Sequence, residues 1–219
     1  MECVLAGLVG NCCLVYIDDI LVMGSTVEEH RENLLQVLDR LRQAGLCLKP
    51  NKCTFFQKQV EYLGYIVSGA GISTDPSKVQ AVQDFPVPSD LKTLRSFFGL
   101  TSYYRRFMPN YSALANPLYA LTRKDITFEC LDECQQTFDR LKESLPHAPI
   151  LAFPDSTQDF HVEIDASDAG LGAILAMSGS SGGRRPIAFA SHTLQAHERN
   201  YGSTELDVLG VVWAVKHFR

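Results

Sequence analysis

Hydrophobic residues dominate the stretch from residue 12 to residue 24, and the adjacent carboxylates of Asp18 and Asp19 interrupt it. Short apolar runs of this kind are typical of buried β-strands. The pattern therefore predicts two strands joined by a tight turn, with the acidic pair at its tip. Leucines then recur at helical spacing until Gly45, and this periodicity predicts a helix over residues 27–44.

The middle of the chain mixes short strand patterns with helical ones. Residues 60–67 and 72–74 are expected to form a second hairpin around a glycine-rich turn. An aspartate or serine followed by helical periodicity is typical of a capped helix start. From such patterns, helices are predicted to begin after Asp75 and Ser89 and to cover residues 110–121 and 131–145.

A strand pattern returns near residue 160. Strands are predicted over residues 160–166, 170–177 and 186–192. A final helix, capped by Ser203, is expected to run to the end of the sequence. Strand runs and helical runs that occupy separate parts of the chain indicate an α+β fold.

Composition limits the functions that the chain can perform. The chain has 219 residues, of which 46% are hydrophobic, and a net charge of −5. A folded protein that does not coat nucleic acid through bulk charge is therefore expected. Residues 91–124 nevertheless hold six basic residues and no acidic one. The six are Lys92, Arg95, Arg105, Arg106, Arg123 and Lys124. Taken alone, the segment favours a solvated helical face whose tyrosines pack into a core, and local phosphate contact is the alternative.

The seven cysteines include no C-x-x-C pair, which favours reduced thiols in an intracellular protein, either cytoplasmic or nuclear. Cys130 and Cys134 would share a helical face, but no histidine pair accompanies them, so no metal site is expected there. The apolar run over residues 4–17 is too short to span a bilayer. No membrane partner is therefore predicted.

Adjacent carboxylates at the tip of a buried hairpin have two explanations. Unpaired charges beside apolar strands must be solvated or bound to a cation, and carboxylates that hold magnesium serve two-metal phosphoryl transfer. Aspartate is also common in an ordinary solvated hairpin turn. Asp18 and Asp19 alone do not decide between these explanations.

The sequence around the pair resembles a known family. Residues 14–22, LVYIDDILV, resemble the Y-x-D-D box of reverse transcriptases in the form found in Gypsy-type LTR retrotransposon Pol polyproteins. Residues 63–67 (LGYIV) resemble the primer-grip hairpin of this family, and residues 94–107 resemble its thumb motif. Residues 141–155 are similar to the tether that leads into ribonuclease H. The four motifs follow the family's order and cover essentially the whole chain.

The resemblance implies roles for particular residues in polymerisation. Asp18 and Asp19 would be catalytic ligands of Mg²⁺, with Mn²⁺ as an alternative ion. The residues expected to contact nucleic acid are Leu63, Gly64, Tyr65, Lys92, Arg95, Arg105 and Arg106. Part of the aromatic set Tyr103, Tyr104 and Phe107 is expected to belong to the core.

Two further acids resemble the metal ligands of ribonuclease H. Asp165 is expected on the inward side of its strand beside Ile164, where a purely structural carboxylate has no obvious partner. The resemblance makes Asp165 the first catalytic metal ligand and Glu205, at the start of the next helix, the second. A structural role also fits Glu205, because an acid in a first helical turn interacts favourably with the helix dipole. Surface positions are expected for Glu163, Asp168 and Asp207.

The family's organisation implies four segments. They are the last part of a palm with its primer-grip hairpin (1–74), a helical thumb (75–124), a tether (125–157) and a truncated ribonuclease H-like three-stranded sheet with one helix (158–219). The implied function of the full-length protein is RNA-directed DNA polymerisation coupled to hydrolysis of the RNA strand of RNA/DNA hybrids. The implied partners are an RNA template, a DNA primer, the RNA/DNA hybrid and the remaining Pol segments.

Each implied active site is expected to be incomplete. A third palm carboxylate would lie before Met1 and further ribonuclease H acids after Arg219, so the chain is expected to be an internal fragment that is inactive alone. The competing hypothesis is a catalytically inactive remnant, or a domesticated scaffold that binds nucleic acid or a protein. Coding sequence that continues on both sides would favour the enzyme.

Overall fold

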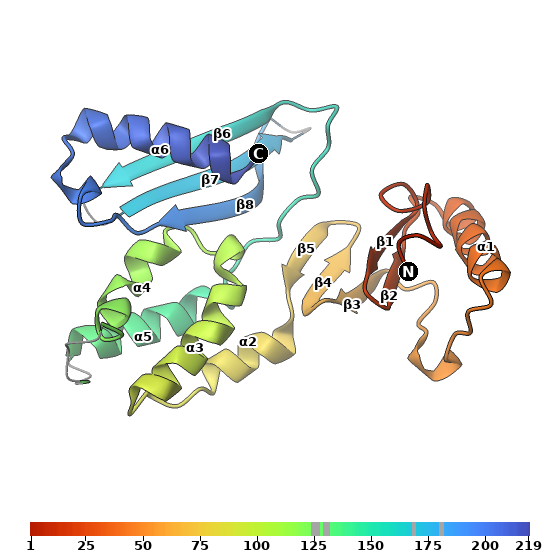
Figure 1. Cartoon of the computed structure of the whole chain (residues 1–219), viewed down its shortest axis with the longest axis horizontal. Helices are drawn as coiled ribbons and strands as arrows, with labels where there is room; N and C mark the ends of the chain where they lie inside the picture. The colour runs from red at the N-terminus through yellow and green to blue at the C-terminus, as the bar shows by residue number, and fades with distance from the viewer. Residues whose placement is uncertain (124–127, 129–131, 168–169, 180–181) are drawn as a thin grey trace. The chain divides into compact units, whose positions relative to one another are not determined.

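The computed structural model describes residues 1–123, 128, 132–167, 170–179 and 182–219 (Figure 1). The chain divides into two compact units, Met1–Tyr62 and Leu63–Arg219. The finer division into four segments stays a prediction. In the described residues, no helix combines the length and the apolar character that crossing a membrane requires.

The first unit contains the hairpin predicted around the acidic pair. Its elements are the strands β1 (Cys13–Tyr16), β2 (Asp19–Val22) and β3 (Gln59–Tyr62), the helix α1 (Val27–Gln43) and the short 3-10 helix η1 (Pro50–Lys52). Strands β1 and β2 pair in antiparallel register, with Tyr16 opposite Asp19. Helix α1 buries Val37 and Leu41 against Leu5 and Cys13. This small core supports one side of the hairpin and leaves the turn in solvent.

The second unit begins with a hairpin and a group of helices. Its first elements are β4 (Tyr65–Ser68), β5 (Gly71–Thr74), α2 (Pro76–Gln83), α3 (Leu91–Tyr103), η2 (Arg105–Phe107), α4 (Tyr111–Ala120) and α5 (Asp132–Ser144). Asp75 caps α2 by accepting a hydrogen bond from the backbone N–H of Ser77 at 2.8 Å. The helices enclose a core whose largest fully buried side chains include Phe97, Phe107 and Phe138.

A three-stranded antiparallel sheet follows in the order β6-β7-β8. Its elements are β6 (Phe160–Ser167), β7 (Gly170–Ser178), β8 (Arg184–His192), the 3-10 helix η3 (Glu198–Asn200) and the helix α6 (Ser203–His217). Helix α6 covers one face, where Gly210 lies so close to Ile164 that a Cβ would approach its Cγ2 to 2.8 Å (Figure 1). The start of α4 contacts the other face, because the Ser112 N–H donates to the Ser191 hydroxyl at 2.8 Å.

The structure corrects several expectations about the elements. Residues 60–67 form parts of two strands, not one, because the chain turns at Leu63 and Gly64 with φ values of 51° and 69°. Asp90, not Ser89, caps α3, since its carboxylate accepts the Thr93 N–H at 2.7 Å. Gly202, not Ser203, is the N-cap of α6. The two cap shifts move each helix start by one residue and leave the fold class unchanged.

The expectation that Asp165 points inward is wrong. Asp165 is exposed. Its neighbour Ile164 packs against α6 at Gly210, and successive side chains of a strand face opposite sides of the sheet. Asp165 therefore lies on the side of the sheet that faces away from α6. The alternation of residues along β6 predicts two faces but does not say which face a helix will cover.

Candidate functional site

The turn between β1 and β2 presents two adjacent carboxylates. Ile17 adopts φ 52° and is 71% exposed, although a left-handed backbone is unfavourable for a β-branched residue and typically costs about 1–3 kcal/mol. Asp18 and Asp19 are both exposed, and neither carboxylate has a hydrogen bond or ion pair to another described residue. A positive φ is also what a tight hairpin turn requires, so the two free carboxylates are the feature of this turn that suits cation binding.

One neighbour of the pair, Tyr62, was not predicted from the sequence. Burial raises the pKa of Tyr62, and the negative charge of Asp19 raises it further, so the phenol stays neutral beside the carboxylate. Burial also raises the pKa of the Cys13 thiol to about 11, with a smaller contribution from Cys12. Cys13 pairs with Val22 at the other end of the hairpin, so this thiol lies away from the acidic turn.

The predicted primer-grip turn is held by two tyrosines from the end of α3. Consecutive positive φ values at Leu63 and Gly64 are typical of a type I′ turn. The Tyr103 hydroxyl donates to the Leu63 carbonyl, and the Tyr104 hydroxyl donates to the Gly64 carbonyl at 2.7 Å. The ring of Tyr65 stacks on Tyr103 with a centroid distance of 5.0 Å. The turn and the thumb-like helix thus form one rigid contact, which the sequence motifs did not reveal because the partners are about 40 residues apart.

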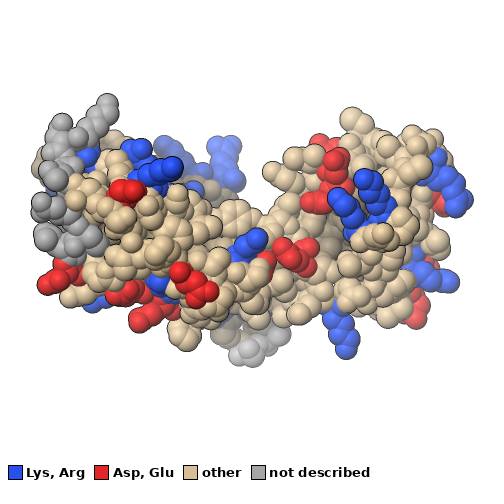
Figure 2. Space-filling view, turned by 90° about the horizontal axis from the view of Figure 1, so that it is seen from below, with Lys and Arg blue, Asp and Glu red and all other residues tan. Residues whose placement is uncertain are grey.

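The basic residues do not form one continuous surface. Lys92 and Arg95 line a shallow hollow on α3, whereas Arg105 and Arg106 belong to η2. Basic side chains on the face drawn in Figure 2 occur in small groups separated by acidic and uncharged surface. Lys124 lies outside the described residues. Local phosphate contacts are therefore available at two separate places.

The aromatic residues of this segment divide as expected. Tyr104 and Phe107 are buried, at 3% and 0% exposure, whereas Tyr103 is 46% exposed. The prediction that part of this set belongs to the core is confirmed. The exposed basic residues of this segment are therefore held in place by a packed aromatic core.

The second pair of predicted metal ligands is not brought into a complete site. Glu205 accepts the Gly202 N–H at 2.8 Å and so closes the first turn of α6. Across the described ranges, no group of three or more His, Cys, Asp or Glu side chains is arranged to hold a metal ion. Asp165 and Glu205 thus remain predicted ligands, and the capping contact gives Glu205 a structural role as well.

Asp207 is a further candidate that the sequence motifs did not single out. It is exposed, and no hydrogen bond or ion pair to another described residue engages its carboxylate. It lies three residues before Gly210, which contacts β6 through Ile164, and residues three apart share a helix face. Asp207 is therefore freer than Glu205 to bind a cation, although both acids belong to α6, which covers the face of the sheet opposite to Asp165. Asp168 lies outside the described residues.

A buried acid orders the loop that precedes α6. Glu198 is 8% exposed and accepts the Gln195 N–H at 2.6 Å, and it lies 3.1 Å from the His192 Nε2. The Gln195 hydrogen bond is the main cause that lowers the pKa of Glu198, with a smaller contribution from His192. This carboxylate ties the end of β8 to the start of α6, and so it positions the helix that carries Glu205 and Asp207.

Comparison with protein families accounts for both parts of the chain. Residues 1–67 match the model of reverse transcriptase (RNA-dependent DNA polymerase), and residues 131–219 match that of the RNase H-like domain found in reverse transcriptase. The Pol polyprotein of the *Drosophila melanogaster* transposon 297 is 39% identical over 100% of this chain. The chain belongs to the Gypsy-type retrotransposon Pol family. This confirms the resemblance and the α+β fold class inferred from the sequence motifs.

Other relatives and solved structures agree with this family. The Pol polyprotein of the *Drosophila melanogaster* transposon gypsy is 35% identical over 98% of the chain. Foamy viral protease-reverse transcriptase in complex with an RNA/DNA hybrid has a TM-score of 0.85 and 27% identity, with 99% of this chain and 29% of that chain covered. Its dRH form in complex with double-stranded DNA has a TM-score of 0.86 and 27% identity, with 99% of this chain and 38% of that chain covered. The chain spans about a fifth of the length of the curated relatives.

Proposed function

We propose that this chain forms part of the polymerase centre of a longer reverse transcriptase, with Asp18 and Asp19 as ligands of Mg²⁺ or Mn²⁺. The observation that carries the proposal is the exposed, strained turn with two carboxylates that have no partner among the described residues. Carboxylate oxygens suit both ions. When bound, such ions activate the primer 3′-hydroxyl and stabilise the leaving pyrophosphate. Ile17 and the paired strands hold the two carboxylates at the tip of the hairpin.

The same longer protein is proposed to grip its template and primer through local contacts. Lys92, Arg95, Arg105 and Arg106 supply cationic side chains for phosphates, which position a strand without reading its sequence. The turn at residues 63–65 is proposed to contact the primer strand, and its bracing by α3 supports that role. The complexes of the similar foamy viral enzyme with DNA and with an RNA/DNA hybrid also support nucleic-acid partners.

Asp165 is proposed as a ligand in a separate ribonuclease H centre, with Glu205 as the second acid and Asp207 as its competitor. Glutamine preserves a capping box, so Glu205→Gln separates capping from metal binding. In a longer Pol protein, loss of hybrid cleavage in Glu205→Gln with activity retained in Asp207→Asn would support Glu205. The opposite result would transfer the role to Asp207.

The alternative function is a nucleic-acid-binding or protein-binding scaffold without catalysis. It is favoured by one observation, namely that the described residues contain no cluster of three metal ligands. We propose that the isolated chain is inactive and that activity requires further Pol segments. These segments are its remaining protein partners in the proposal, and an intracellular location, cytoplasmic or nuclear, suits a chain with free thiols.

DNA synthesis on a primed RNA template tests the polymerase proposal. In a longer Pol protein that contains this chain, Asp19→Asn should abolish incorporation. The matched control is Asp39→Asn, which removes an exposed carboxylate from α1. Synthesis that survives in Asp19→Asn at the level of Asp39→Asn would exclude Asp19 from the catalytic centre.

A further inference from the structure

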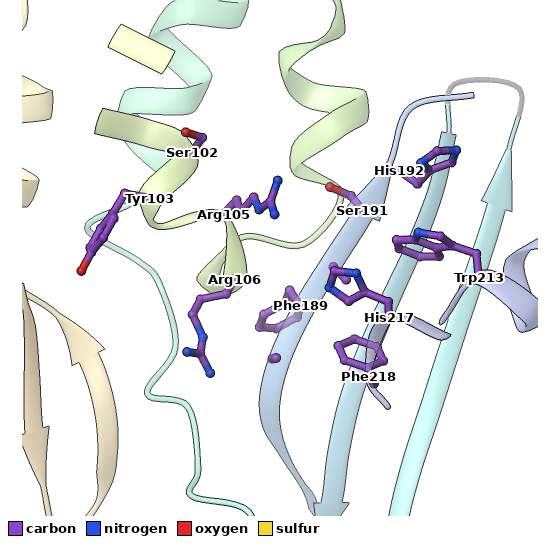
Figure 3. Close-up of a pocket in the computed structure, with 12 residues that line it drawn as sticks. Ser102, Tyr103, Arg105, Arg106, Phe189, Ser191, His192, Trp213, His217 and Phe218 are labelled. Carbon is purple, nitrogen blue, oxygen red and sulfur yellow. The ribbon is translucent and has the colours of Figure 1, made fainter. Parts of the chain in front are cut away.

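A cleft of about 510 Å³ lies within the second unit, between η2 and the edge of the sheet (Figure 3). Strand β8 lines it with five consecutive residues, from Ala188 to His192. Figure 3 shows Arg105 and Arg106 on one side of β8 and the aromatic residues of α6 on the other. The cleft therefore combines a cationic wall with an aromatic wall.

The cationic wall has no acidic counterpart. The residues that line the cleft include Arg105 and Arg106 but no aspartate or glutamate. Neither guanidinium forms an ion pair within the described part of the chain. The Nε of Arg106 is buried and has no hydrogen-bond acceptor among the described atoms. A buried donor without an acceptor is unfavourable, so this side of the cleft is suited to an anion.

The aromatic wall contains planar rings close to one another. The ring centroids of Trp213 and His217 are 5.5 Å apart, and those of His217 and Phe218 are 5.2 Å apart. His192 from β8 lies 5.8 Å from Trp213. Aromatic side chains beside arginines are the usual means of binding nucleic-acid bases without sequence preference.

The dimensions of the cleft favour one strand over a duplex. Five strand residues span about 13 Å at about 3.3 Å per residue. A volume of about 510 Å³ is typical of a site for a small ligand, so a duplex is too bulky to enter. A few unstacked nucleotides of one strand fit the length, the positive charge and the aromatic wall.

We propose that this cleft binds single-stranded nucleic acid, with phosphates at Arg105 and Arg106 and bases against Trp213, His217 and Phe218. The proposal rests on the nucleic-acid function proposed above. It separates the two arginines from Lys92 and Arg95, which line a different hollow on α3. A single strand held here is distinct from the duplex gripped by the α3 surface.

Trp213 makes the cleft directly observable, because it is the one tryptophan of the whole chain. The intact 219-residue protein is titrated with an oligothymidylate dodecamer at low salt while tryptophan fluorescence is recorded. Saturable quenching is expected, and Arg106→Gln should weaken it about tenfold through the loss of one charged contact. Arg140→Gln, which removes an exposed charge from α5, should leave the quenching curve unchanged. If Arg106→Gln fails to fold, Arg105→Gln provides the same test at an exposed position.

Parallel titrations with a blunt hairpin duplex, polyglutamate and inorganic phosphate distinguish the ligands. Quenching by oligothymidylate alone supports the proposal. Equal quenching by polyglutamate would identify an acidic-peptide site and overturn it, and equal quenching by phosphate or duplex would overturn the assignment to a single strand. Duplex binding detected by anisotropy, with no quenching by the dodecamer, would refute the cleft and leave the duplex grip intact. Absence of both signals would refute the nucleic-acid function itself.

Discussion

Tyr104→Phe removes one hydroxyl from the contact that holds the Leu63–Gly64 turn against α3. The Tyr104 hydroxyl donates to the Gly64 carbonyl at 2.7 Å, and the Tyr104 side chain is 97% buried. A hydrogen bond of this kind contributes about 0.5–1.5 kcal/mol, and a carbonyl left desolvated raises the loss to about 1–3 kcal/mol. The ring itself stays in the core, so the change in the free energy of unfolding measures the contribution of the hydroxyl alone. We expect the free energy of unfolding of the second unit to fall by about 1–2 kcal/mol.

Urea denaturation followed by circular dichroism measures this loss. Tyr201→Phe is the control, because Tyr201 is 40% exposed and its hydroxyl makes no hydrogen bond to another described residue. The control should change the free energy by less than about 0.5 kcal/mol. In a longer polymerase, Tyr104→Phe should also raise the KM for primer-template more than it lowers kcat. Equal stability of the two variants would refute the claim that the turn is braced by this hydroxyl.

Three other perturbations test separate parts of the structure. Glu198→Gln should destabilise the second unit by about 1–2 kcal/mol near neutral pH, because its buried acceptor contacts weaken. The folded-state pKa of Glu198 is lowered, so its stabilisation is present above the ordinary carboxyl pKa and is lost as pH falls through the lowered value. The urea midpoints of the two proteins should therefore converge in acid. Gly172→Ala should cost about 1–3 kcal/mol, because its Cβ would collide with the Asn110 side chain, and Asn110→Gly should restore the loss in thermal denaturation. The double variant Lys92→Gln/Arg95→Gln should reduce the slope of log K against log salt concentration for duplex binding by about 2, since each phosphate contact contributes about 0.9 to this slope.

Control variants separate these three effects from the general loss of a side chain. Glu143→Gln, at an exposed position of α5, should have little effect, and a constant difference between Glu198→Gln and the parent at every pH would contradict the titration argument. Failure of the glycine at position 110 to rescue Gly172→Ala would place the clash elsewhere. Lys58→Gln/Lys216→Gln removes two exposed charges outside the basic segment. An equal fall in slope with that pair would mean that duplex binding is not local.

Much of the fold follows from patterns that are local in sequence. The hairpin at Asp18 and Asp19 and helix α1 were predictable, because strand runs, turn residues and helical periodicity act over a few residues. The turn at Leu63 was not, because an apolar residue with positive φ inside an apolar run gives no turn signal. The motif resemblance supplied the family and the candidate carboxylates, which local patterns alone left undecided.

Long-range contacts account for what the sequence did not reveal. Glu198 and His192 come together through the loop after β8, and nothing in their spacing indicates a contact between the two side chains. Asp165 is exposed because α6 covers the other face of the sheet. The close contact of Gly210 with Ile164 determines which face the helix covers. These are features of the assembled fold and not of any segment alone.

We propose that the chain contributes to two separate metal-dependent centres, one at Asp18 and Asp19 and one at Asp165. The most direct measurement compares DNA synthesis and RNA/DNA hybrid cleavage in a single longer Pol protein that carries either Asp18→Asn or Asp165→Asn. Asp18→Asn should abolish synthesis and spare cleavage, and Asp165→Asn should abolish cleavage and spare synthesis. Loss of both activities in either variant of a stably folded protein, or of neither, would contradict two independent centres.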